Sequence, residues 1–241
     1  MTLENIRKKA DGGEVKILFI GDSLTYYNDV PRLFANMAAA AKKSVFVNSL
    51  VKGGTTVKMW WETPELRARV DEKINANAWD IVIFQPQRNE TVMPEYFPDA
   101  PTEEMNAAVE LVMLIRSIGA MPLQYSSFGV EKGSVVRGEY VKKMTKREHT
   151  DLVTEYNASV AERVGCDVVC VGRSFNRADE LYPEIDLYAV DRVHASLAGS
   201  FLAAASFCAV IFGESPEALE FDGGLPSDVA GRLKSVAAEL I

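Results

Sequence analysis

The sequence predicts a three-layer α/β/α sandwich built on a flavodoxin-like parallel sheet of five strands. Short apolar runs, too short to form helices, alternate along the chain with longer segments of helical periodicity. Strands separated by helices form parallel βαβ units, whose crossovers place helices on both faces of one sheet. At 241 residues and 48% hydrophobic content, the chain is long enough to bury a sizeable core, so we expect residues 1–241 to form a single domain.

The strands are predicted from runs of β-branched and other apolar residues bounded by glycine, proline or polar residues. The first run is the most distinct, because Val15 and Ile17 to Ile20 are followed at once by Gly21 and Asp22. The predicted strands are residues 15–20, 44–51, 80–85, 121–125 and 167–171.

The segments between these strands have apolar residues at helical spacing. Pro64 interrupts or restarts the second helix, Thr102 is a plausible N-cap of the third, and Gly165 ends the fourth. The predicted helices are residues 31–43, 57–77, 102–117, 146–164, 195–212 and 227–240. Residues 86–101 are predicted to form a long loop, residues 126–145 to be irregular, and residues 172–191 to form a loop with a short helix.

Composition excludes several classes of function. The net charge of −8 argues against nucleic acid or an anionic membrane as the main partner. No apolar run approaches the ~18 residues of a membrane span, and the charged first residues lack the apolar core of a signal peptide. The three cysteines, Cys166, Cys170 and Cys208, have no metal-type spacing and are expected to be buried free thiols, which fits a reducing compartment. We therefore expect a cytoplasmic protein.

One serine and one histidine are placed for nucleophilic catalysis. Ser23 follows the first strand directly and therefore lies at the carboxyl edge of the sheet, where open α/β folds bind ligands. A serine hydroxyl needs an adjacent base, and the sequence has two histidines. His194 lies in an Asp-x-x-His segment that also reaches this edge, whereas His149 is expected on a charged, solvated helix face. Asp22 is not expected to orient the base, because neighbouring side chains in a turn point apart.

The segments Gly21-Asp22-Ser23-Leu24 and Asp191-x-x-His194, in this order and at opposite ends of the chain, resemble the SGNH (GDSL-type) hydrolase superfamily. The resemblance extends from Ile17 to roughly Phe212. It implies the SGNH hydrolase fold, with Ser23 as nucleophile, His194 as base and Asp191 as the acid that orients the imidazole. For Asp191, a helix cap is the structural alternative, and one aspartate can serve both purposes.

The resemblance also implies three donors for an oxyanion. These are the Ser23 backbone N–H, a glycine after the second strand, and an asparagine after the third. By position the glycine is Gly53, with Gly54 as the near alternative, and the asparagine is Asn89. The third block departs from the usual Gly-x-Asn-Asp, because this chain has Gln87-Arg88-Asn89-Glu90 there. Gln85 or Gln87 could therefore supply the side-chain amide instead, and a poorly characterised branch with Gln-x-Gln at this place is most similar.

The predicted function is hydrolysis of a small acyl ester through an acyl-enzyme, with no cofactor and no metal. Within the resemblance, an acylated sugar such as an O-acetyl carbohydrate is the first candidate substrate. The aromatic residues Tyr26, Tyr27, Trp60 and Trp61 either stack on a sugar ring or pack in the core. Two other functions compete with esterase activity. One is a non-catalytic carbohydrate-binding protein on the same fold, and the other is a phosphate or nucleotide binder, which Asp22 disfavours.

Overall fold

The computed structural model describes residues 1–136 and 139–241 of the protein. In this part of the chain the larger sheet has five strands, which are β1 (Val15–Gly21), β2 (Val45–Val51), β3 (Ile81–Phe84), β4 (Met121–Ser126) and β7 (Asp167–Cys170). Their spatial order is β2-β1-β3-β4-β7, and every neighbouring pair is parallel. This is the flavodoxin-like order, so the predicted fold class is confirmed.

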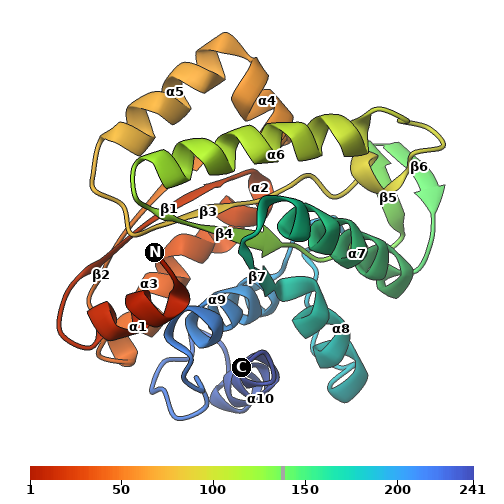
Figure 1. The fold of residues 1–241 in the computed structure, drawn as a ribbon. Coiled ribbons are helices and arrows are strands. Elements are labelled where there is room, and N and C mark those ends of the chain that lie inside the picture. The colour runs from red at the N-terminus through yellow and green to blue at the C-terminus, as the bar shows by residue number, and fades with distance from the viewer. Residues whose placement is uncertain (137–138) are drawn as a thin grey trace.

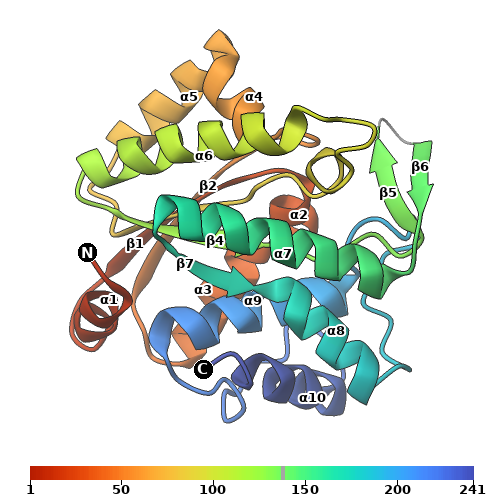
Figure 2. The same cartoon turned by 45° about the vertical axis from the view of Figure 1, so that its right-hand side comes forward.

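Helices cover both faces of the sheet (Figures 1 and 2). One face packs against α4 (Val57–Glu62), α5 (Pro64–Asn75), α6 (Ala100–Ser117) and α7 (Lys146–Val164). The other face packs against α1 (Leu3–Ala10), α3 (Val30–Ala40), α8 (Val171–Leu181), α9 (Leu197–Phe212) and α10 (Ser227–Ala238). We call the core on the face with α4 to α7 the first core and the core on the opposite face the second core. Side chains alternate along β1, so Leu18 and Ile20 lie in the first core, whereas Ile17 and Phe19 lie in the second.

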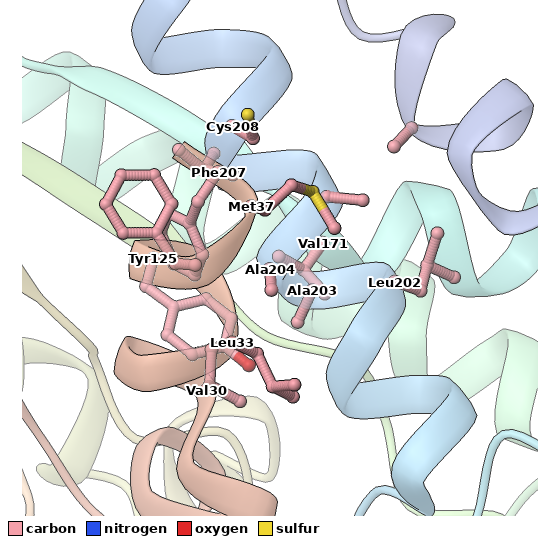
Figure 3. Packing of buried hydrophobic residues seen from close by; sticks show 14 of the residues in the cluster. Val30, Leu33, Met37, Tyr125, Val171, Leu202, Ala203, Ala204, Phe207 and Cys208 are labelled. Carbon is pink, nitrogen blue, oxygen red and sulfur yellow. The ribbon is translucent and has the colours of Figure 1, made fainter. Parts of the chain in front are cut away.

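The second core is centred on α9, where Phe207 lies between the sheet and α3. Its ring centroid is 5.3 Å from that of Phe19 and 5.1 Å from that of Tyr125, both in edge-on geometry. Figure 3 shows Phe207 and Tyr125 beside Met37 and Leu33 of α3. Nearly the whole circumference of α9 is buried, which explains why its sequence is apolar throughout rather than amphipathic.

Three local differences from the sequence prediction have physical causes. The first residues form α1, because Thr2 and Asn5 make a capping box. Residues 126–145 are not irregular throughout, since β5 (Gly133–Val136) pairs with β6 (Glu139–Lys143) in an antiparallel hairpin; positions 137–138 lie outside the described residues. Helix α6 begins at Ala100 rather than Thr102, because Pro101 lies in its first turn, where a proline lacks no hydrogen bond that the helix needs.

Short helical turns occupy two of the connections at the carboxyl edge of the sheet. After β1 come α2 (Ser23–Tyr26) and the 3-10 helix η1 (Tyr27–Asp29), and the loop after β3 contains the 3-10 helix η2 (Glu90–Val92). The helices formed by residues 1–136 and 139–241 include none that is long and apolar enough to cross a membrane. All three cysteines are free thiols; Cys208 is buried as predicted, whereas Cys166 and Cys170 are only partly buried.

Replacing Phe207 with alanine is expected to lower the free energy of unfolding by about 3–5 kcal/mol, because the fully buried ring leaves a cavity among other aromatic rings. Urea denaturation measures the change. The control is Met113→Ala on the solvent face of α6, which should change the free energy by no more than about 0.5 kcal/mol. A loss below about 1 kcal/mol for Phe207→Ala would contradict the packing described above.

Candidate active site

The predicted site residues gather where β1 and β3 end side by side. Ile20 pairs with Phe84, so the chain leaves the sheet at Gly21 and at Gln85 next to each other. From this point the strand order runs outward to β2 on one side and to β4 and β7 on the other. It is therefore the topological switch point of the sheet, where open α/β folds bind ligands.

Ser23 is the first residue of α2, and its turn is held by hydrogen bonds from both sides. Asp22 caps α2 by accepting a hydrogen bond from the Leu24 N–H at 2.8 Å. The side chain of Gln85 donates to Asp22 Oδ1 at 2.8 Å and accepts from the Thr25 hydroxyl at 2.7 Å. A Cβ at Gly21 would lie 2.3 Å from the Thr25 hydroxyl, so only glycine allows this close approach.

Ser23, His194 and Asp191 form a continuous hydrogen-bonded series. The Ser23 Oγ lies 2.8 Å from His194 Nε2, and His194 Nδ1 lies 2.6 Å from Asp191 Oδ2. The other carboxylate oxygen of Asp191 accepts from the backbone N–H groups of Val193 and His194, both at 2.9 Å. The structure thus brings together three residues predicted from opposite ends of the chain.

These contacts set the protonation of the series. Partial burial acts to raise the pKa of Asp191, but the hydrogen bonds from the His194 side chain and from the two backbone N–H groups outweigh it and lower the pKa to about 2. Asp191 is therefore ionised at neutral pH and can only accept a hydrogen bond. The proton then lies on His194 Nδ1, which leaves Nε2 free to accept the proton of Ser23.

Two arginines fasten the loop that carries His194. Arg192, in the left-handed conformation at φ 60°, donates to both carboxylate oxygens of Glu131 and to Asp186 at 2.6 Å. Arg88, which is 5% exposed, donates to the carbonyl oxygens of Val193 at 2.7 Å and Phe128 at 2.8 Å. A ring stack fixes the imidazole itself, because Tyr27 lies parallel to His194 with centroids 4.3 Å apart.

Of the four aromatic residues singled out from the sequence, Trp60 and Trp61 pack within the protein. Trp60 is buried in the core beside α6, and Trp61 packs under the guanidinium of Arg67. Tyr26 is 43% exposed, and its hydroxyl lies 2.9 Å from the position that a Cβ of Gly53 would occupy. Of the four, Tyr26 and Tyr27 therefore lie close to the predicted site residues.

A pocket of about 570 Å³ opens over Ser23 and His194. Its walls include Gly54 from the loop after β2 and Gln87 and Asn89 from the loop after β3. Gly53 is the neighbour of Gly54 on the same loop but does not line the pocket. The structure therefore brings the two predicted donor loops to the same cavity as the serine.

Glu104 of α6 holds these two loops together. It is 3% exposed, and its carboxylate accepts hydrogen bonds from the backbone N–H groups of Val57, Lys58 and Gln87 at 2.8–2.9 Å. Burial raises the pKa of Glu104 above its usual value, although these N–H groups act in the opposite direction. The sequence prediction placed Glu104 within the helix over residues 102–117 and gave it no part in the site, because the groups it binds lie on distant segments of the chain.

The prediction for His149 was wrong. His149 is fully buried, its Nδ1 accepts from the Val130 N–H at 3.0 Å, and its Nε2 lies 3.0 Å from the Arg88 carbonyl oxygen and 3.1 Å from the Ser134 hydroxyl. The charged sequence around it suggested a solvated face, but His149 lies on the buried face of α7 together with Thr150 and Val153. Arg88, which anchors the loop of His194, was also not singled out from the sequence.

In the described part of the chain, no group of three or more His, Cys, Asp or Glu residues is arranged to hold a metal ion. The predicted absence of a metal remains a prediction.

Comparison with known proteins gives structural neighbours that cover most of the chain. A protein from Slackia heliotrinireducens, assigned to the SGNH hydrolases, is 25% identical and matches 80% of this chain and 96% of its own with a TM-score of 0.60. A protein of the DUF4886 family from Bacteroides uniformis is 12% identical, with a TM-score of 0.78 over 94% of both chains. An acetylxylan esterase from Geobacillus stearothermophilus is 21% identical, with a TM-score of 0.59 over 82% of this chain and 94% of its own.

A scan against protein-family models gave no match, and a search of curated proteins gave no significant match. The structural neighbours confirm the resemblance to the SGNH superfamily that the sequence motifs indicated.

Stability is expected to depend on His149 between pH 6.5 and pH 4. Burial, together with the nearby Arg88 charge, lowers the pKa of His149 to about 4, so below pH 6.5 the unfolded chain takes up a proton that the native protein refuses. The free energy of unfolding should therefore fall by up to about 3 kcal/mol across this range. The measurement is urea denaturation of the wild type and His149→Gln at several pH values. A difference between the two proteins that does not change with pH would show that the native protein does not exclude the proton.

Proposed function

Because the fold is that of the SGNH hydrolases, we propose that the protein is a serine esterase, with Ser23 as nucleophile, His194 as general base and Asp191 as the group that orients the imidazole. The observation that carries the proposal is the hydrogen-bonded series from Ser23 Oγ through both ring nitrogens of His194 to Asp191. Geometry of this kind, with an ionised acid behind the base, is what activates a serine hydroxyl.

The reaction has two steps. In the first, Ser23 Oγ bonds to the ester carbonyl carbon while its proton passes to His194 Nε2, and the carbonyl oxygen becomes an oxyanion. The tetrahedral intermediate then collapses, His194 returns the proton to the leaving alcohol, and an acyl-enzyme remains. In the second step, His194 removes a proton from water as the water oxygen bonds to the acyl carbon. The bond between that carbon and Ser23 Oγ then breaks, His194 returns the proton to Oγ, and the carboxylic acid leaves.

The oxyanion is stabilised by donors from three places around the pocket. These are the backbone N–H of Ser23, the loop that carries Gly53 and Gly54, and a side-chain amide from the loop after β3, where the sequence register predicts Asn89. The pocket walls support this assignment, because both loops border the cavity above the serine.

The proposed substrate is a small acyl ester, with the O-acetyl group of a carbohydrate as the first candidate. Its support is the likeness to the acetylxylan esterase, for which serine-to-alanine and aspartate-to-alanine variants are described as catalytic mutants. The exposed ring of Tyr26 beside the site provides a surface on which a sugar ring can stack.

Ser23→Ala is expected to reduce hydrolysis of p-nitrophenyl acetate by at least about 10³-fold, because the nucleophile is removed. The control is Ser159→Ala on the exposed face of α7, which should keep wild-type activity. Labelling with a fluorophosphonate followed by peptide mapping provides the second measurement. The label should appear on Ser23 in the wild type and be absent from His194→Ala.

Either of two results would overturn the proposal. One is full hydrolysis by the Ser23→Ala protein, and the other is a folded wild-type protein in which Ser23 takes no label. The second result would favour binding without turnover.

A further inference from the structure

The loop after β3 carries three side-chain amides, and we infer that Gln87, rather than Asn89 or Gln85, donates the side-chain hydrogen bond to the oxyanion. The inference rests on the proposed esterase function and assigns the donor that the sequence left open among these residues. The hydrogen bonds of Gln85 and Gln87 differ, and they leave only the Gln87 amide nitrogen available to a ligand.

Both polar atoms of the Gln85 side chain make hydrogen bonds to the turn that carries Ser23. Its Nε2 donates to Asp22 Oδ1, and its Oε1 accepts from the Thr25 hydroxyl, while the residue is 3% exposed. Redirecting this amide toward a substrate would break both bonds and leave the Asp22 carboxylate without one of its donors. Gln85 therefore positions Ser23 and is not available to the oxyanion.

Gln87 is held at every polar atom except the one that an oxyanion requires. Its backbone N–H donates to Glu104 at 2.8 Å, and its carbonyl oxygen accepts from the Thr91 hydroxyl at 2.7 Å. Its Oε1 accepts from the Asn89 N–H at 2.7 Å and from the Thr91 N–H at 3.4 Å. Over residues 1–136 and 139–241, the Nε2 of Gln87 makes no hydrogen bond to protein.

The direction of this amide follows from the same contacts. Oxygen and nitrogen lie on opposite sides of the amide carbon, so binding Oε1 to the loop's own backbone turns the two Nε2–H groups away from that backbone. Gln87 forms part of the wall of the pocket that also contains Ser23 and His194. Its Nε2 is not buried, so it is accessible to a ligand.

Asn89 has a different part in this arrangement. It lines the same pocket, but its backbone N–H is the group that fixes Gln87 Oε1. The residue in the predicted asparagine position thereby contributes to the orientation of the glutamine two residues before it. Because this contribution comes from the backbone, it survives a change of the Asn89 side chain.

Glu104 extends the same frame to the second donor loop. The carboxylate that binds the Gln87 N–H also binds the Val57 N–H at 2.9 Å and the Lys58 N–H at 2.9 Å. These two groups lie at the start of α4, directly after the loop of Gly53 and Gly54. A donor that is already held in place needs no reorganisation when charge develops, and this is the condition for strong stabilisation of an oxyanion.

Gln87→Glu tests the inference most sharply. The glutamate keeps an oxygen acceptor for the Asn89 and Thr91 N–H groups but replaces the donor Nε2 with a second oxygen. With p-nitrophenyl acetate, kcat should fall by about 10²–10³-fold while KM changes less than about threefold, because the donor acts on charge that develops only in the transition state. Gln87→Ala should reduce kcat to a similar extent, and the rate of Ser23 labelling by a fluorophosphonate should fall in both variants.

Glu95→Gln is the matched control, because it exchanges a carboxylate and an amide of the same size at an exposed position of the same loop, outside the pocket; its kcat should stay within about threefold of the wild type. Asn89→Ala separates the two assignments of the donor, and its loss of kcat should be smaller than that of Gln87→Glu. Circular dichroism and the melting temperature establish that each variant is folded. A kcat for Gln87→Glu within threefold of the wild type would overturn the inference, as would a 10²-fold loss confined to Asn89→Ala. If wild-type turnover does not depend on Ser23, the proposed function fails and this inference fails with it. Ser23-dependent turnover that is insensitive to both Gln87 variants overturns this inference alone.

Discussion

The parallel pairing of β1 with β3 is the constraint on which the site depends. Because Ile20 lies opposite Phe84, the residues that follow the two strands must emerge next to each other, at one edge of the sheet. The hydrogen bond from Gln85 to Asp22 connects the segments that follow β1 and β3 and fixes the turn at the start of α2. A register shift of one residue would exchange the inward and outward side chains and separate the serine turn from the amides of the next loop.

Around this edge the protein places several charged groups in surroundings that disfavour charge. Burial lowers the pKa of Arg88 and raises the pKa of Asp22 and of Glu104. None of the three makes a close ion pair within the described residues. Their hydrogen bonds are largely to backbone groups of the loops that surround the pocket, so the desolvation of each charge is offset by fixing a loop. The groups that act on a substrate can then lie on loops and still be held rigidly.

The sequence predicted the strands well because their signal is local. Apolar runs and the breaks that follow them gave all five strands of the larger sheet, and alternation with helices gave their parallel order. Ser23 and His194 could be found because the serine directly follows the first strand and the sequence has two histidines, and the resemblance to the SGNH hydrolases added Asp191. Their approach to within hydrogen-bond distance follows from the convergence of parallel strands at one edge.

Contacts between distant segments gave no comparable signal. The burial of His149 depends on the Val130 N–H and the Arg88 carbonyl group, neither of which its own helix reveals. The orientation of Gln87 depends on Glu104, seventeen residues away, and on the Asn89 N–H. The direction of a backbone N–H in a loop cannot be inferred from the sequence pattern. The hairpin β5–β6 was missed because glycines within a polar stretch are equally typical of a loop.

The position of His194 directly before α9 has a consequence for how activity is lost. Helix α9 is almost entirely buried, and two residues separate it from the histidine. The segment that carries the base and its aspartate therefore cannot leave its place while the core remains intact. Under the proposed mechanism, loss of turnover on heating should coincide with cooperative unfolding of the core rather than precede it through local fraying. We also expect the site to assemble late in folding, because Ser23 and His194 are 171 residues apart in sequence and closing so long a loop is entropically costly.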